Sequence, residues 1–313
     1  MKRHFVTGGL GQIGSHIVEL LLARGDRVVV MDNLATGRRE HLDDHPNLTV
    51  LIDTIADRAA VDRVMNEHRP DTVVHTAASY KDAEDWYSDA LTNCVGGANV
   101  VQAARDAGVG RFIYFQTALC YGLRPQQQPI RLDHPRAPAP NSYAISKTTN
   151  ELYLEASGID YVTFRLANVV GPRNVAGPLP IFYQRLKDGK RCFVTKARRD
   201  FVFVGDLART VVRACDGVGK GTYHFSSGTD VSIQELYDAV VEAMDLPHAP
   251  SPEVKDLGPD DVASILLDPS RLFADFGTLA FTPLRETVAA AVDYYRRHGT
   301  LGEYTHLRLQ AAR

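Results

Sequence analysis

The chain begins with a short apolar strand pattern that leads directly into a glycine-rich loop. Residues 4–7 read HFVT, residues 8–14 read GGLGQIG, and an amphipathic helical pattern follows. Such a turn needs glycine where the chain turns tightly, where a ligand touches the backbone, and where helix and strand pack closely. The loop therefore predicts a strand–turn–helix unit in which the helix N-terminus faces a bound anion.

The glycine spacing also matches a dinucleotide-binding fingerprint. Asp32 ends the second strand pattern, 18 residues after Gly14. A carboxylate there accepts both ribose hydroxyls of an adenosine and repels a 2′-phosphate, which favours NAD over NADP. Arg38 and Arg39 follow in the next loop and keep NADP open as an alternative. In the loop itself, the expected contacts to the cofactor are Gly8, Gly11, Gln12, Ile13 and Gly14.

Strand and helix patterns alternate through the first half of the chain. Strands are predicted at residues 4–7, 27–31, 48–52, 72–75, 111–115 and 161–165, with helices at 13–23, 59–68, 93–107 and 143–156. The strands are nearly continuous apolar runs, which is typical of parallel strands covered on both faces. The sequence therefore predicts an α/β fold with a Rossmann-type doubly wound parallel sheet over residues 1–170.

The second half of the chain has a less regular pattern. Short strands are predicted at residues 192–194, 201–204 and 222–225, and helices at 179–187, 206–215, 233–244 and 284–297. We expect residues 171–313 to form mainly a smaller C-terminal α/β cap that binds substrate, with a segment near 200–226 returning to the sheet. Residues 123–141 contain five prolines, so this stretch is predicted to be a loop that forms a wall of the site.

Composition excludes several classes of function. The chain has 313 residues and a formal net charge of −3, which disfavours a broad basic surface for nucleic acid. It has no apolar run near the roughly 20 residues that span a bilayer. Its four cysteines lack a C-x-x-C pair, and we expect reduced thiols, no metal site and a cytoplasmic location.

Three residues further along the chain suggest acid–base chemistry. Thr117 comes at the carboxyl end of a buried strand, the edge where open parallel sheets bind ligands. Tyr143 and Lys147 are four residues apart and share one helix face. A free phenol has a pKa of about 10, and a nearby ammonium is expected to lower that pKa. The pattern predicts Thr117, Tyr143 and Lys147 as catalytic residues acting on an alcohol or carbonyl.

Together these motifs resemble those of the extended short-chain dehydrogenase/reductases, in the NAD-dependent epimerase/dehydratase family that acts on nucleotide sugars. The match extends from residue 2 to about residue 292 and also involves residues 73–78, 165–173 and 199–208. The resemblance implies that Asp32 holds the adenosine ribose, with Asn33 beside it, and that Asp53 holds the adenine amino group. It also implies that Ala77 lets the cofactor pass close to the fourth strand and that Lys147 binds the nicotinamide ribose.

The resemblance extends to substrate and assembly. It implies that Asn168 contacts the diphosphate of a nucleotide sugar and that Arg199 binds the nucleotide, while Thr117 aligns the reacting hydroxyl. It also implies a homodimer whose interface pairs the helices predicted at residues 93–107 and 143–156. The sequence leaves the nucleotide open among UDP, dTDP, GDP and CDP, and the sugar open between neutral and acidic.

Two departures from the family pattern narrow the activity. Dehydratases and decarboxylases of this family usually carry a carboxylate just after the catalytic Thr or Ser, but here Ala118 and Leu119 follow Thr117. A diphosphate-binding Arg usual near residue 258 is also missing, with Lys196, Arg198 or Lys255 as alternative sources of the charge.

Since epimerisation needs no such carboxylate, the sequence predicts an NAD-dependent nucleotide-sugar epimerase that inverts C4 through a transient 4-keto intermediate. The alternatives are a 4-reductase, dehydrogenase or decarboxylase on the same scaffold, an NAD-dependent alcohol dehydrogenase of a non-sugar substrate, or a dinucleotide sensor without catalysis.

Overall fold

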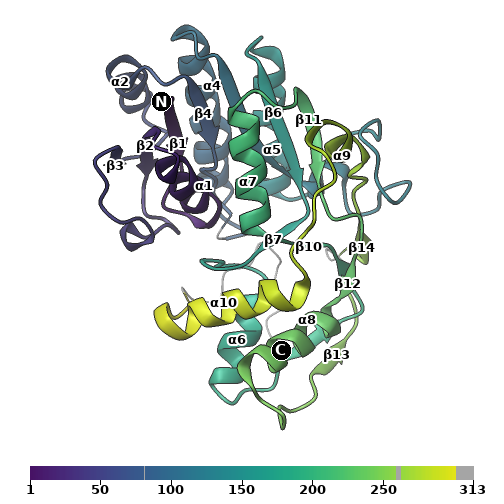
Figure 1. Ribbon diagram of the computed structural model, residues 1–313. Helices are drawn as coiled ribbons and strands as arrows, with labels where there is room; N and C mark the ends of the chain where they lie inside the picture. Colours follow the sequence, from purple (N-terminus) through teal and green to yellow (C-terminus); the bar gives the residue numbers. More distant parts are fainter. Residues whose placement is uncertain (81, 259–261, 301–313) are drawn as a thin grey trace.

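The upper part of the molecule is one parallel sheet (Figure 1). The computed structural model describes residues 1–80, 82–258 and 262–300. The sheet has seven strands in the order β11-β6-β5-β4-β1-β2-β3. Their bounds are β1 Arg3–Thr7, β2 Arg27–Asp32, β3 Leu48–Ile52, β4 Thr72–His75, β5 Arg111–Thr117, β6 Tyr161–Leu166 and β11 Gly221–Phe225. The order reverses between β1 and β4, which opens a crevice at their carboxyl ends.

Helices cover both faces of this sheet, so the prediction of a doubly wound fold is confirmed. One face carries α1 (Gln12–Ala23), α7 (Val204–Cys215) and α9 (Ser270–Phe276), and the other carries α2 (Arg58–His68), α4 (Gly97–Asp106) and α5 (Ser142–Ala156). Successive strand residues point to opposite faces: Val6 packs in the cluster with α1 and α7, and Phe5 packs in the cluster with α2 and α4. Figure 1 shows α7 in front of the sheet, beside α1.

The lower part of the molecule is the cap (Figure 1). Three helices enclose a separate apolar core: α6 (Pro178–Lys187), α8 (Ile233–Met244) and α10 (Leu284–His298). Short strands flank them in two small sheets, β8 (Phe193–Thr195) with β13 (Glu253–Lys255), and β12 (Val231–Ser232) with β9 (Arg198–Arg199) and β14 (Ser264–Ile265). At the junction with the main sheet, β7 (Asn168–Val170) pairs in parallel with β10 (Phe201–Phe203).

Part of the second half of the chain belongs to the main sheet. The helix predicted at residues 206–215 is α7 and packs on the sheet, and β11 adds the seventh strand beside β6. The helix predicted at 93–107 is preceded by α3 (Trp86–Asp89), begins as the π-helix η2 (Ala90–Gly96), and continues as α4. Residues 123–141 are irregular, as predicted, except for a bridge between Ile130 and Leu267.

A chain of hydrogen bonds connects the cap to the glycine loop. In α10, the hydroxyl of Tyr294 lies 3.0 Å from Nε2 of His41, and Nδ1 of His41 lies 2.7 Å from the carbonyl oxygen of Leu10. Because the carbonyl only accepts, Nδ1 carries the proton and Nε2 accepts from the tyrosine. The last cap helix is therefore tied to the loop between β1 and α1.

Within the described part of the chain, none of the helices is both long and apolar enough to cross a membrane. The four cysteines, Cys94, Cys120, Cys192 and Cys215, are free thiols.

Candidate active site

The glycine loop is shaped by contacts that only glycine allows. Gly8 has φ +66°, and a Cβ there would lie 2.6 Å from the backbone nitrogen of Ala77, just past the end of β4. A Cβ on Gly14 would overlap the carbonyl oxygen of Gly8. These two glycines therefore bring α1 and the fourth strand close to the loop, as a bound diphosphate requires.

The start of α1 is prepared for an anion. The N-cap residue is Gly11, no side chain caps the helix, and no acidic residue lies in its first turn. The side-chain nitrogen of Gln12 is buried and has no hydrogen-bond partner among the described residues, although its oxygen accepts from Asn174 at 3.4 Å. A positive helix end with free backbone donors and an unpaired buried amide fits a pyrophosphate. The predicted contacts Gly11, Gln12 and Ile13 lie together here.

Asp32 lies at the carboxyl end of β2 and is buried. Its carboxylate accepts hydrogen bonds from the backbone N–H groups of Leu10 (2.9 Å) and Leu34 (2.8 Å). Burial raises the pKa of Asp32, and these two donors partly oppose the rise. A Cβ on Gly37 would lie 2.9 Å from both carboxylate oxygens, so that glycine leaves room at the acid.

Asp53 lies next to Asp32, as an adenosine site requires. Its backbone N–H donates to the carbonyl of Asp32 at 3.2 Å, and its carboxylate accepts from the backbone of Thr54 at 2.8 Å. Asn33 is exposed, and its side-chain oxygen accepts from the backbone of Ala35 at 3.0 Å. The Asn33 amide therefore shapes its own turn, and its part in holding the cofactor stays a prediction.

At the crevice between β1 and β4, a buried threonine and a buried histidine lie beside the backbone of Ala77. The hydroxyl of Thr7 lies 2.6 Å from Nδ1 of His75 and accepts from the backbone N–H of Ala77 at 3.3 Å. Burial lowers the pKa of His75 to about 3, with a further contribution from Lys147, so this ring is neutral. His75 thus packs at the strand end and contacts the Thr7 hydroxyl that binds the backbone of Ala77.

The three predicted catalytic residues come from two neighbouring elements. Thr117 ends β5, and its hydroxyl accepts from the backbone N–H of Leu119 at 3.2 Å. Tyr143 and Lys147 lie one turn apart on α5, which packs along β5 and β6. Asn141 caps this helix by accepting from the backbone of Ala144 at 2.8 Å. The geometry thus brings the helix with the Tyr–Lys pair against the strand that ends at Thr117.

The charge states of this pair differ from the sequence prediction. Burial raises the pKa of Tyr143, with smaller contributions from Tyr80 and Asp89. Burial lowers the pKa of Lys147 to about 7, against an upward pull from Glu151. The prediction of a lowered Tyr143 pKa is therefore wrong for the protein alone, because burial of the phenol disfavours the phenolate.

Sequence reasoning missed a buried polar network behind the site. Glu151, one turn after Lys147, is fully buried, and its carboxylate accepts from Arg165 (3.0 Å) and from the amide of Gln116 (3.0 Å). The Gln116 oxygen in turn accepts from the backbone N–H of Thr117 at 2.8 Å. The sequence did contain a signal for this network: Glu151 follows Lys147 by four residues, and Arg165 lies inside an otherwise apolar strand.

The two predicted substrate residues lie at the junction of sheet and cap. Asn168 is exposed at the start of β7, and its backbone N–H donates to the carbonyl of Asp200 at 2.9 Å. Arg199 precedes Asp200 in the chain and ends β9. Its guanidinium donates to the carbonyl of Arg198 at 2.8 Å. β7 pairs with β10, where Asn168 lies opposite Phe201, two residues after Arg199 in the chain.

Of the alternatives for the missing diphosphate-binding arginine, Arg198 is engaged elsewhere. Its guanidinium bonds Asp230 at 2.8 Å and lies 3.8 Å from Glu235. The ammonium of Lys255 lies 4.5 Å from the centre of the Phe193 ring, and Lys196 is exposed. The segment near residue 258, where the usual arginine is missing, includes residues 259–261, which lie outside the described residues.

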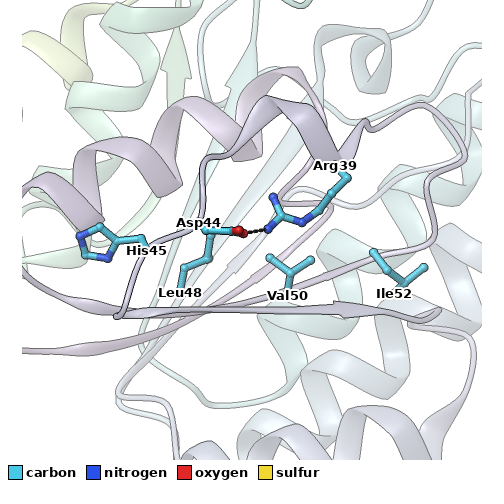
Figure 2. Close-up of a pocket in the computed structure, with 6 residues that line it drawn as sticks. All are labelled: Arg39, Asp44, His45, Leu48, Val50 and Ile52. Atoms are coloured by element: carbon cyan, nitrogen blue, oxygen red, sulfur yellow. Dashed lines mark hydrogen bonds and ion pairs between the residues drawn. The ribbon is translucent and has the colours of Figure 1, made fainter.

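A groove of about 400 Å³ lies away from this constellation, beside the edge strand β3. Figure 2 shows the residues that line it: Arg39, Asp44, His45, Leu48, Val50 and Ile52. Of these, Arg39 and Asp44 form an ion pair. Four strand spacings separate β3 from β5, which is roughly 19 Å. The groove therefore does not belong to the Thr117 site.

Comparison with known proteins agrees with this geometry. Residues 4–225 match the model of the NAD dependent epimerase/dehydratase family. The UDP-glucose 4-epimerase of Mycolicibacterium smegmatis is 32% identical over 311 residues, which cover 94% of this chain and 98% of that protein.

Two crystal structures of Bordetella bronchiseptica enzymes are also similar. WbmH in complex with NAD⁺ is 72% identical, with a TM-score of 0.95 over 96% of this chain and 100% of that one. WbmG in complex with NAD and UDP is 39% identical, with a TM-score of 0.90 over 99% of each chain. The prediction drawn from the sequence motifs is therefore confirmed: this chain belongs to the NAD dependent epimerase/dehydratase family.

Proposed function

We propose that this protein is an NAD-dependent epimerase of a nucleotide sugar, which inverts C4 through a transient 4-keto sugar. The observation that carries the proposal is the helix with Tyr143 and Lys147, packed against the strand that delivers Thr117 to the carboxyl edge of the sheet. Ala118 and Leu119 follow in the 3₁₀ turn η3 (Ala118–Tyr121), so this turn supplies no carboxylate for elimination of water or for decarboxylation.

The glycine loop, Asp32, Asp53 and Ala77 would hold NAD across the crevice between β1 and β4. When bound, NAD supplies a hydride acceptor and a positive charge beside the phenol, and that charge favours the phenolate. Tyr143 would take the proton from the C4 hydroxyl and return it after the sugar has turned. Thr117 would align that hydroxyl, and Lys147 would hold the nicotinamide ribose.

For the substrate, we propose a nucleoside diphosphate sugar with UDP as the nucleotide. The support is the pair Asn168 and Arg199 at the junction with the cap, together with the similarity to a UDP-glucose 4-epimerase and to an enzyme crystallised with UDP. Arg199 would pair with the nucleotide, because a guanidinium is suited to phosphate.

We also propose a homodimer built on the outer faces of α3, η2 and α5. Within the described residues, these elements expose a cluster of large apolar side chains, each at least 48% accessible: Trp86, Tyr87, Val95, Ile145, Leu152 and Tyr153. The helices pack side by side, so these side chains lie on neighbouring elements. A patch of this kind in a water-exposed position marks an interface, and the proposed partner is a second copy of the chain.

The test is turnover without added cofactor. Purified protein should contain bound NAD and should interconvert a UDP-hexose and its C4 epimer with no lasting absorbance change at 340 nm, because the hydride returns to the same sugar. A reductase or dehydrogenase would instead need added cofactor and would change the absorbance stoichiometrically. Sedimentation at micromolar concentration, compared between the native chain and Trp86→Lys/Leu152→Lys, tests the dimer.

A further inference from the structure

We propose that Tyr114 is a positioning residue for Lys147, holding the lysine by its main-chain carbonyl and by its ammonium at once. This inference rests on the proposed function, since it concerns the lysine expected to hold the cofactor. Tyr114 lies inside β5, three residues before Thr117, and is fully buried. It therefore does not contact substrate itself.

Tyr114 makes two different contacts with the same lysine. The phenol of Tyr114 donates a hydrogen bond to the carbonyl oxygen of Lys147 at 2.9 Å. The ammonium nitrogen of Lys147 lies 4.2 Å from the centre of the Tyr114 ring. A cation within about 6 Å of a ring face is attracted by the ring, most strongly where water is excluded. One side chain thus fixes the backbone and the charged end of Lys147.

The Tyr114 ring is itself held in place from the neighbouring strand. The rings of His75 and Tyr114 stack with their centres 5.8 Å apart and an interplanar angle of 24°. His75 is anchored in turn by Thr7 at the end of β1. The lysine on α5 is therefore connected through Tyr114 and His75 to the strand that enters the glycine loop.

The contact between the Tyr114 ring and the Lys147 ammonium matters because Lys147 is buried, where a charged group is destabilised by the loss of water. The side chain is 4% exposed, and burial disfavours the ammonium. The ring of Tyr114 opposes this without adding a negative charge that would also disfavour the phenolate of Tyr143. Further titratable or charged groups act on Lys147 or on its neighbours Tyr114, Tyr143 and Glu151: Glu151 on α5, His75 on β4, Arg165 on β6, Asp89 on α3 and Cys94 on η2.

Two substitutions separate the ring from the hydroxyl, and a third is a matched control. Tyr114→Leu removes both contacts, and Tyr114→Phe keeps the ring and removes the hydrogen bond. Phe112→Leu removes an equally buried ring from the same strand and face, which also contacts His75 at 6.0 Å but is two residues further from the site. A general loosening of the core would affect Tyr114→Leu and Phe112→Leu alike.

The readout is the titration of Lys147 in full-length cofactor-free protein, followed by NMR of lysine labelled with ¹³C at Cε. The chain has eight lysines, and the Lys147 signal is identified by its loss in Lys147→Met. The pKa of Lys147 should fall by about one further unit in Tyr114→Leu, because the ammonium loses its ring. It should stay unchanged in Tyr114→Phe and in Phe112→Leu.

An unchanged pKa in Tyr114→Leu, or an equal fall in Phe112→Leu, overturns the proposal. If Tyr114→Leu does not fold, the hydroxyl is tested alone: Tyr114→Phe should lower kcat a few-fold at unchanged KM, and equal kcat values overturn that part. The titration requires no turnover, so it decides the role of Tyr114 even if the native protein epimerises no nucleotide sugar. Failure of the proposed function and failure of this inference are thus distinguishable.

Discussion

The sheet region and the cap are built in opposite ways. The sheet has seven strands of four to seven residues, and its glycine loop fits closely against neighbouring backbone. The strands of the cap and of the junction have two or three residues each, and the cap's core lies between three helices. Long paired strands hold atoms rigidly, whereas short strands can change without unfolding the whole. The proposed chemistry therefore lies on the rigid part, and the proposed recognition of substrate lies next to the adaptable part.

The strongest test of this division is the loss of the proposed acid–base group. Tyr143→Phe removes one hydroxyl from α5 and should lower kcat by about 10³-fold, because positioned proton transfer contributes on that order. NAD content and the CD spectrum should stay as in the native chain. Near-normal turnover of a variant that retains NAD would contradict the assignment of chemistry to the sheet region.

The next test concerns the glycine loop. Gly8→Ala forces a side chain into a left-handed position 2.6 Å from backbone, and we expect NAD affinity to fall by about 100-fold. Gly108→Ala is the control, since Gly108 has nearly the same φ (+68°) but a Cβ at that position would meet nothing within 4 Å. The control should cost only about 1 kcal/mol of stability. Isothermal titration of stripped protein with NAD measures both, and equal losses of affinity would mean that the close approach to Ala77 is unimportant.

A smaller effect is expected at the junction. Arg199→Ala should raise the KM for a UDP-sugar by about 30-fold and change kcat little, because the guanidinium binds ground and transition states alike. The adjacent Arg198→Ala should leave KM nearly unchanged, since Arg198 is paired with Asp230. Steady-state kinetics on both variants measures KM. A raised KM in Arg198→Ala and an unchanged KM in Arg199→Ala would assign nucleotide binding to Arg198 and not to Arg199.

The smallest effect is expected within the cap itself. Ser232 and Glu235 form a capping box at the start of α8, with the backbone of Glu235 donating to Ser232 at 3.1 Å. Ser232→Ala should lower the free energy of unfolding by about 1 kcal/mol. Denaturant titration measures this loss, while NAD affinity should stay constant. A change in NAD affinity would show that the start of α8 contributes to cofactor binding.

The same contrast explains what the sequence could and could not predict. The strand bounds in the sheet region agree with the structure within about two residues, because buried parallel strands leave a strong apolar pattern. Among the helices, the one predicted at residues 93–107 differs more in its start, and α9 was missed. The strands β7, β9, β12, β13 and β14 were missed, since two- or three-residue strands are defined by partners far along the chain. Residues 93–96 of the π-helix η2 were read as ordinary helix, because a seven-residue segment is too short for its apolar period to distinguish the two helix types.

The candidate site shows a similar limit. The residue types and spacings of Gly8, Gly14 and Asp32 are local and were readable from sequence. The pKa direction of Tyr143 was not, because it depends on how completely water is excluded by Tyr80 and other segments distant in sequence. Likewise, Tyr114 reads as one more apolar residue of a buried strand, and only the packing of α5 shows that it contacts Lys147 twice.

The hydrogen bonds from Tyr294 through His41 to Leu10 bear on how the protein melts. They join the last cap helix to the loop that would carry the cofactor's phosphates, so neither region can lose its structure while the other keeps all its bonds. Calorimetry of the stripped protein should then record a single endotherm, and saturation with NAD should displace that whole peak to higher temperature, the cap included.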